Sequence, residues 1–302
     1  MAPRLGLGGG VTADPSSGLF ASTPLLLDTY PNAHRAYSVR KLRTEYTGYA
    51  MKVREGSGMN YTADVAFDDD GVVSASSKIY NPTGNGSDGD ALSAFVSSTN
   101  GFVTTWYDQS GEGSNATQPT AAAQPKIWDS SGGLNTEGDG DASASLLFDG
   151  SDDVMYVDEA GLSLASVTAF VVMKHTDQSS ETPWFLSASS GNYYGHFKST
   201  TDQFWYDTGS ASSATSTTDQ RLFSYKGASG SQILNINGSA ATGTGTSEAT
   251  EALTDSYLNG IGAFAGLYYW GGEFQEFIIY DSDQTSNLTT IESDINTAFN
   301  IY

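Results

Sequence analysis

The stretch WYDQSGEG, which begins at Trp106, concentrates side chains that could do chemistry: two aromatic rings, two carboxylates, an amide and two glycines. It could be a catalytic loop, a metal-binding loop or a turn. We favour the turn, because Asp108 and Ser110 can hydrogen-bond to their own backbone and Gly111 and Gly113 can adopt positive φ. We expect Trp106 itself to be buried at the end of a strand.

Other catalytic patterns are weak. The three histidines, His34, His175 and His196, are far apart in the sequence and form no H-E-x-x-H motif, so we expect no zinc site. The stretch GASGSQ (227–232) does not match the strand-to-helix elbow of serine hydrolases. The stretch GLGGG (6–10) lacks the preceding strand that a nucleotide-binding loop requires.

Loops rich in Asp and Gly are candidate cation sites. They are FDDDG (67–71), GNGSDGD (84–90), EGDGD (137–141) and FDGSDD (148–153). Calcium takes about six to eight oxygen ligands, and carboxylates spaced by glycine can supply them. No stretch matches an EF-hand loop, and Asp-Gly turns are also ordinary connections between strands. We expect plain turns and no cofactor, with one structural calcium ion as the alternative.

Paired aromatic residues near loops are candidate contacts for sugars. Flat rings pack against the apolar faces of sugars, but aromatic residues in strands more often belong to the core. Both interpretations stay open for six residues: Tyr193, Tyr194, Trp205, Tyr268, Tyr269 and Trp270.

The net charge of −22 excludes two classes of partner. So acidic a chain is repelled by nucleic-acid phosphates and by anionic membranes, so we expect neither as a partner. The chain has no cysteine and shows no secretory signal pattern at its beginning, so we expect it to fold in a cytoplasm.

From residue 145 onward, short apolar runs alternate with turn residues, for example SVTAFVVMKH, RLFSYKGA and GEFQEFIIYD. This spacing predicts an antiparallel sandwich or barrel, and we expect one such domain over residues 20–302. GFVTTWYD and YAMKVRE should be strands, and Phe148 should be buried.

Three helices are also predicted. Ala36, Val39 and Leu42 have a spacing compatible with a helix that stops near Gly48. A short helix should follow Asp90 as its N-cap. The last helix should bury one face and begin after Ser282 or Asp283; that face is formed by Leu288, Ile291, Ile295 and Phe299.

Three segments carry a family resemblance: AYSVRKLRTEYTGYAMKVR (36–54), GFVTTWYDQSGEGSNATQPTAAAQPKI (101–127) and LLFDGSDD (146–153). Together they resemble the catalytic sandwich domain of the fungal-type α-L-arabinofuranosidase B family. The same order of segments resembles lamin-G-like, or concanavalin-A-like, domains of structural proteins of bacteriophages, marine phages among them. The resemblance covers residues 30–302 and implies an all-β, concanavalin-A-like (jelly-roll) antiparallel sandwich.

This sequence departs from the enzymes where the resemblance implies catalysis. Retaining glycosidases need two carboxylates about 5 Å apart. The enzymes' acid follows a GIGG stretch, and here GIGAFAG (260–266) puts Phe264 in that place. Their nucleophile lies in an Asp-Leu-Glu-Asn-like run, and the nearest segment, DQFWYDTGS (202–210), has no Glu. The cysteine pair of their sugar pocket is missing too.

We therefore expect a non-enzymatic structural protein of a bacteriophage virion, either a capsid decoration or a surface protein of a fibre or tail. Contact with host-surface glycans is compatible with this role. The alternative is a retaining glycoside hydrolase of the arabinofuranosidase type.

Residues 1–19 are rich in Gly, Pro and Ser and have the composition of an arm. Arg4, Leu5 and Leu7 could dock on a neighbouring virion subunit, because an extended segment with small residues can lie close to another backbone. This predicts a homo-oligomer, or many copies in an assembly. The alternative is an arm that folds back on its own domain.

Overall fold

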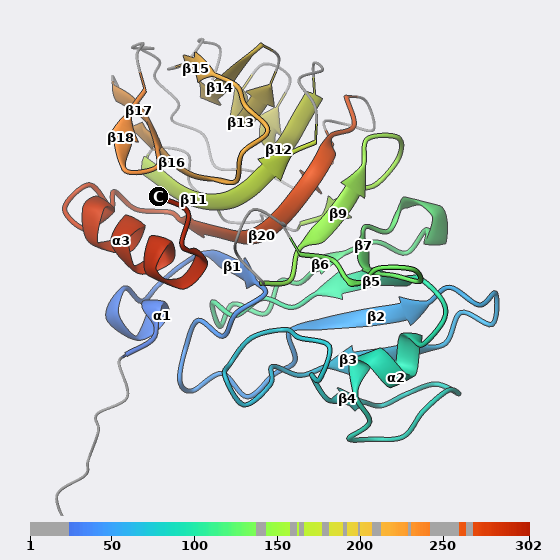
Figure 1. Cartoon of the computed structure of the whole chain (residues 1–302). Coiled ribbons are helices and arrows are strands. Elements are labelled where there is room, and N and C mark those ends of the chain that lie inside the picture. Colours follow the sequence, from blue (N-terminus) through green and yellow to red (C-terminus); the bar gives the residue numbers. More distant parts are fainter. Residues whose placement is uncertain are drawn as a thin grey trace, which may run out of the picture.

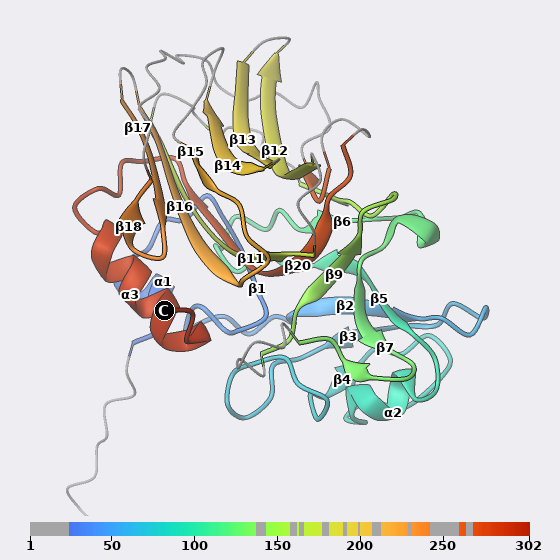
Figure 2. The ribbon, with the colours of Figure 1, turned by 45° about the horizontal axis from the view of Figure 1, so that its top comes forward.

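The structure is a computed structural model of the 302-residue chain, and it describes residues 24–136, 143–157, 162, 166–176, 181–189, 192–198, 200–206, 213–228, 231–241, 260–263 and 268–302. Figures 1 and 2 show an all-β antiparallel jelly-roll sandwich with a few short helices, as the sequence predicts. The described part contains no helix long and apolar enough to span a membrane.

A central sheet is built around β11 (Ser166–His175) and β20 (Gly271–Tyr280), which pair antiparallel. Beyond β11 follow β16 (Arg221–Ala228), β17 (Ser231–Ile236) and β18 (Ser239–Ala240), while β1 (Arg35–Ser38) and β9 (Leu146–Asp149) pair with β20. Nearly all residues of β11 and β20 are buried, because other elements cover both faces of these strands.

A second group of strands packs on the inner face of this sheet. It consists of β12 (Glu181–Ser189), β13 (Asn192–Lys198), β14 (Thr201–Tyr206) and β15 (Ser213–Thr215), joined in chain order, with β19 (Gly260–Ile261) and β10 (Met155–Tyr156) beyond β12. The ring of Trp184 lies 5.0 Å from that of Tyr225 and 5.4 Å from that of Phe277, centroid to centroid. These aromatic contacts hold the two layers together.

The first half of the chain supplies the remaining strands, in the lower part of Figure 1. They are β2 (Met51–Glu55), β3 (Thr62–Val65), β4 (Ile79–Tyr80), β5 (Gly101–Trp106), β6 (Ala116–Thr117), β7 (Lys126–Asp129) and β8 (Gly133–Leu134). Trp106 packs on Tyr37 of β1 with ring centroids 5.9 Å apart. Trp106 and Phe148 are 0% and 1% exposed, so both are core residues as predicted.

The helices are α1 (Leu26–Thr29), α2 (Leu92–Val96), a 3₁₀ turn over Ala121–Ala123, and α3 (Leu288–Phe299). α3 lies beside β16, β17 and β18 at the edge of the molecule and buries the face that the sequence predicts. α2 is also the short helix that the sequence predicts.

Three local predictions are wrong. The segment around Ala36 is strand β1, paired with β20, because all four of its residues are buried and a three-residue spacing also fits a strand followed by a turn. Asp90 accepts a bond from the backbone N–H of Ser87, and α2 begins after Ala91. α3 begins after Asn287, while Asp283 accepts bonds from Thr285 and pairs with Lys226.

Candidate functional site

The WYDQSG segment is a turn built around one buried carboxylate. Oδ1 of Asp108 accepts bonds from the N–H groups of Ala36 and Ser110, both at 2.9 Å, and Oδ2 accepts the Ser110 hydroxyl at 2.7 Å. Oδ2 also accepts the N–H of Gly113 at 3.1 Å. Gly111 and Gly113 have φ of 104° and 78°, where glycine is favoured. The interpretation as a turn is confirmed.

The same turn binds the segment that follows β1. Oε1 of Gln109 accepts the N–H of Leu42 at 2.9 Å, and its amide nitrogen donates to the carbonyl of Arg40 at 3.0 Å. The indole N–H of Trp106 donates to the carbonyl of Ser38 at 3.3 Å. Two of the three sequence segments that carry the family resemblance, 36–54 and 101–127, are therefore joined in one structural unit.

A cluster that the sequence did not reveal lies inside the sandwich, where His175 of β11 and His196 of β13 meet Asp202 of β14. Nε2 of His175 and Nε2 of His196 lie 2.9 Å and 3.1 Å from Oδ1 of Asp202. All three side chains are at most 1% exposed. Sheet register brings these residues together, and no short motif in the sequence indicates that register. The histidines are widely spaced along the chain, and nothing in that spacing indicates that two of them meet in the fold.

The hydrogen-bond partners of the cluster determine which ring nitrogen of His175 carries a hydrogen. The indole N–H of Trp270 donates to Nδ1 of His175 at 2.8 Å, and indole nitrogen can only donate. The hydrogen of this neutral ring is therefore on Nε2, which donates to Asp202. His196 contacts Asp202 through Nε2 and the Tyr225 hydroxyl through Nδ1. A metal at Nε2 of His175 would need a hydrogen on Nδ1, facing the Trp270 donor, so this donor set does not fit a metal.

Burial and hydrogen bonding set the charges of the cluster. Burial lowers the pKa of His175 to about 4, so this ring is neutral near pH 7. Burial opposes the ionised form of Asp202, but the bonds from His175 and His196 hold its pKa well below the usual range. Arg221 lies 3.2 Å from its second oxygen, Oδ2. Asp202 is thus an ionised carboxylate shut away from solvent, which ties four strands together.

The FDGSDD loop gathers three carboxylates. Oxygens of Asp149, Asp152 and Asp153 lie within 4.8 Å of one another. Asp149 accepts the N–H of Ser151 at 2.8 Å, and Asp153 accepts the N–H of Asp149 at 3.0 Å. Burial, together with the charge of Asp149, raises the pKa of Asp153 to about 7. The group could hold a cation, and it also forms an ordinary Asx turn.

In two other acidic loops, an Asp carboxylate accepts hydrogen bonds from the backbone of its own loop. Asp68 accepts the N–H groups of Asp70 and Val72, and Asp90 accepts that of Ser87. The fourth loop, EGDGD (137–141), lies outside the described residues.

The structure divides the six aromatic residues proposed for sugar contact. Tyr194 and Trp270 are fully buried, which corrects the expectation for both: Tyr194 packs on the rings of Trp184 and Phe204, and Trp270 is bound to His175. Of the other four residues, Tyr268 is 53% exposed and Tyr269 is half-buried. The side chains of Tyr193 (β13) and Trp205 (β14) lie outside the described residues.

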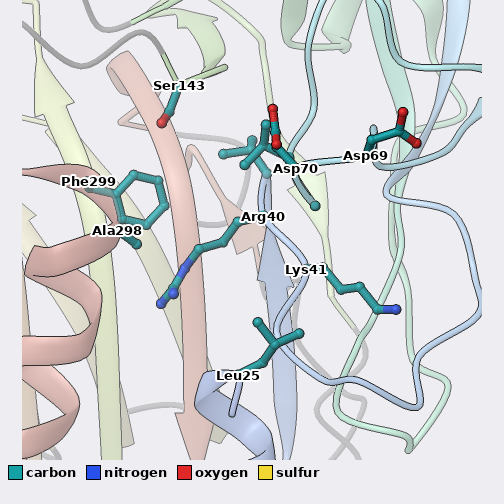
Figure 3. Close-up of a pocket in the computed structure, with 11 residues that line it drawn as sticks. Leu25, Arg40, Lys41, Asp69, Asp70, Ser143, Ala298 and Phe299 are labelled. Carbon is teal, nitrogen blue, oxygen red and sulfur yellow. The ribbon is translucent and has the colours of Figure 1, made fainter. Parts of the chain in front are cut away.

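Arg4, Leu5, Leu7 and Phe264 also lie outside the described residues. Figure 3 shows a surface pocket of about 380 Å³ between the start of α1, the loop at 69–72 and the end of α3. No sequence pattern predicts this pocket, because its lining comes from five separate segments.

Comparison with known proteins supports the fold. No family model matches the sequence, and no curated protein matches it. Among solved structures, a GH54 α-L-arabinofuranosidase soaked with a cyclic sulfate inhibitor is similar over 91% of this chain, with a TM-score of 0.59 at 13% identity. An arabinofuranosidase complexed with arabinofuranosyl-α-1,2-xylobiose gives 0.57 at 14% identity over the same share.

A mutant of a GH54 enzyme soaked with 4-nitrophenyl α-L-arabinofuranoside gives a TM-score of 0.60 at 12% identity. In each case the match covers 64% of the enzyme chain. The chain therefore has a sandwich fold like that of these arabinofuranosidases. Function does not follow from fold alone.

Proposed function

We propose that this chain is a non-enzymatic structural protein of a bacteriophage particle, a capsid decoration or a surface protein of a fibre or tail. The observation that carries the proposal is the state of Asp202. It is the one acidic residue of the DQFWYDTGS segment (202–210) that the structure describes. It is 0% exposed, and its oxygens are held by His175, His196 and Arg221. A nucleophile must reach substrate, and this carboxylate does not.

The neighbouring position argues in the same direction. In an Asp-Leu-Glu-Asn-like run the Glu follows the Asp by two residues, so Phe204 takes the place of the Glu when Asp202 is matched to the Asp. Successive side chains alternate across a strand, so the two residues face the same side of β14. The Phe204 ring is fully buried and packs on Tyr194 and Tyr225 at 5.1 Å and 5.2 Å. Aromatic packing fills the space that a catalytic carboxylate would need.

The enzymatic half of the proposal is tested with 4-nitrophenyl α-L-arabinofuranoside. We expect no release of nitrophenol by the parent chain above the rate of a heat-denatured sample. Asp202→Asn is the diagnostic variant, and Asp90→Asn, in an exposed turn, is its matched control. Hydrolysis by the parent that Asp202→Asn abolishes and Asp90→Asn retains would contradict the proposal.

One observation favours the alternative, a retaining arabinofuranosidase-type hydrolase. Asp149 and Asp153 have oxygens within 4.8 Å of each other, near the separation of about 5 Å used by retaining enzymes. The raised pKa of Asp153, about 7, would suit a general acid. However, Asp149 is bound to the backbone of its own loop. Activity lost in both Asp149→Asn and Asp153→Asn, but kept in Asp202→Asn, would support this alternative.

The particle half of the proposal is supported by the sequence segments that resemble phage sandwich domains and by the net charge of −22, which disfavours nucleic acid and membrane as partners. We propose that the protein resides in the virion, in many copies. Co-sedimentation with infectious particles in a density gradient tests this. Recovery only in the soluble fraction of the lysate would contradict it.

Host glycans are a further proposed partner, through Tyr268 and Tyr269 rather than the buried rings. Tyr268 is the better candidate, because 53% of it is exposed and its ring is in contact with Phe197 at 6.3 Å. A glycan array should give a signal that Tyr268→Ala removes and Tyr302→Ala, another exposed tyrosine, keeps. An array without hits would rule out this partner.

A further inference from the structure

The pocket in Figure 3 has an apolar lining beside a charged rim. Its volume is about 380 Å³, and Arg40, Lys41, Asp69 and Asp70 contribute its charged groups. The apolar lining comes from Leu25, Val39, Val72, Ala298 and Phe299. A short peptide with aliphatic side chains and one charge is the kind of ligand that such a lining fits.

The charges of the rim differ in how they are paired. Arg40 is already bound: its Nε lies 2.8 Å from Glu276, its Nη1 lies 3.1 Å from Asp294, and its guanidinium lies 5.5 Å from the Phe299 ring. Asp69 and Asp70 are exposed, and neither carboxylate has an ion pair or hydrogen bond within the described part of the chain. The rim therefore offers two carboxylates to a cation from outside the described fold.

One segment of this chain has the matching chemistry. Arg4 is the only Lys or Arg before Arg35, and Leu5 and Leu7 follow it with a glycine between them. We propose that residues 4–7 of one copy bind in this pocket of a second copy, with Arg4 at Asp69 and Asp70 and the two leucines in the apolar part.

The position of the pocket allows an exchange between copies. Leu25 lines it, so the chain leaves the described domain at the rim of the site. Residues 8–24 can span about 55–60 Å when extended, which exceeds the diameter of about 50 Å of a compact domain of this length. Each copy would donate one arm and receive one, a head-to-tail contact that can repeat through an assembly. This inference rests on the proposed function, because a structural protein of a particle is held beside other copies of itself.

Cysteine cross-linking tests the contact in the full chain, because the natural sequence has no cysteine. One preparation carries Leu7→Cys and another Ala298→Cys, an exposed position that lines the pocket. The matched control replaces Ala298→Cys with Ser98→Cys, exposed just beyond α2 and remote from α3. After mixing and mild oxidation, we expect the Ala298 pair to give at least about fivefold more mixed disulfide dimer than the control, as for a contact of modest free energy.

Charge reversal then tests the role of Arg4. Adding Arg4→Glu to the Leu7→Cys chain should lower the yield about fivefold, as expected for the loss of an exposed ion pair. Combining it with Asp69→Lys and Asp70→Lys on the partner should restore the yield.

Two results would overturn the inference. One is an equal yield with Ala298→Cys and Ser98→Cys. The other is a chain carrying both Leu7→Cys and Ala298→Cys that closes only within itself, which would show that the arm binds its own domain. Failure to find the protein in particles would overturn the proposed function and leave the cross-linking result standing, so the two failures are distinguishable.

Discussion

The indole N–H of Trp270 lies 2.8 Å from Nδ1 of His175, and this single contact decides the tautomer of the ring. It makes Nε2 the donor to Asp202, which also faces His196. A buried carboxylate with three cationic or N–H partners is satisfied internally, so it stabilises the sandwich.

The tautomer can be measured directly. We expect long-range ¹H–¹⁵N spectra at pH 7 to show the hydrogen of His175 on Nε2, and we expect one equivalent of Zn²⁺ to leave these signals unchanged. In Trp270→Phe the donor is lost, so the ring is free to exchange tautomers. A hydrogen on Nδ1 in the parent, or loss of the His175 signals on addition of zinc, would contradict this assignment.

The same ring makes stability depend on pH. The pKa of His175 is about 4 in the folded state and about 6.5 when unfolded. The unfolded chain therefore binds more protons between these values, and the free energy of unfolding falls as pH falls from about 6.5 to about 4, by up to ~3 kcal/mol. Because Asp153 has the opposite effect over the same window, urea unfolding at several pH values is measured in an Asp153→Asn background, with added His34→Asn as the control that keeps the dependence. A flat profile over this window in that background would contradict the burial of a neutral His175.

Asp153 has the opposite effect on stability. Its folded-state pKa, about 7, is above its ordinary value, so the folded state binds more protons and stability falls as pH rises from about 4 to about 7. Asp153→Asn can still accept the N–H of Asp149 and carries no charge. We expect this variant to be more stable than the parent at pH 8 by ~1–2 kcal/mol, since solvent screens part of the effect. Lower stability at pH 8 would contradict the raised pKa.

Calcium is tested in the same loop. If this loop is a plain turn that binds no ion, millimolar Ca²⁺ should leave the melting temperature of the parent unchanged at pH 8. A rise that disappears in both Asp149→Asn and Asp153→Asn would show instead that the three carboxylates of this loop bind the ion.

The WYDQSG turn should be essential for folding. Trp106→Ala is expected to cost about 3–5 kcal/mol, as for other buried aromatic residues. Asp108→Ala leaves several N–H groups without an acceptor and should cost about as much, since bonds to charged groups contribute ~1.5–3 kcal/mol each. Ser98→Ala, an exposed control, should be neutral. A melting temperature within a degree or two of the parent in either core variant would contradict this account of the turn.

The sequence predicts strands such as β11 and β20, because a strand that is buried on both faces has a continuous run of apolar residues. It also predicts the turn at Asp108, whose glycines and short polar side chains act locally. It misses β1, because a four-residue strand takes its conformation from its partner β20.

The buried cluster cannot be predicted from local sequence patterns for a similar reason. His175 and Trp270 are 95 residues apart, and only the pairing of β11 with β20 places them in contact. The pocket at Leu25 likewise gathers residues from both ends of the chain.

Quantitative mass spectrometry of purified, salt-washed particles tests the central claim most directly. The account predicts that peptides of this chain are present at a fixed ratio of several copies per particle, comparable to known structural subunits. Absence of the chain from particles in which other structural proteins are detected at that depth would contradict it.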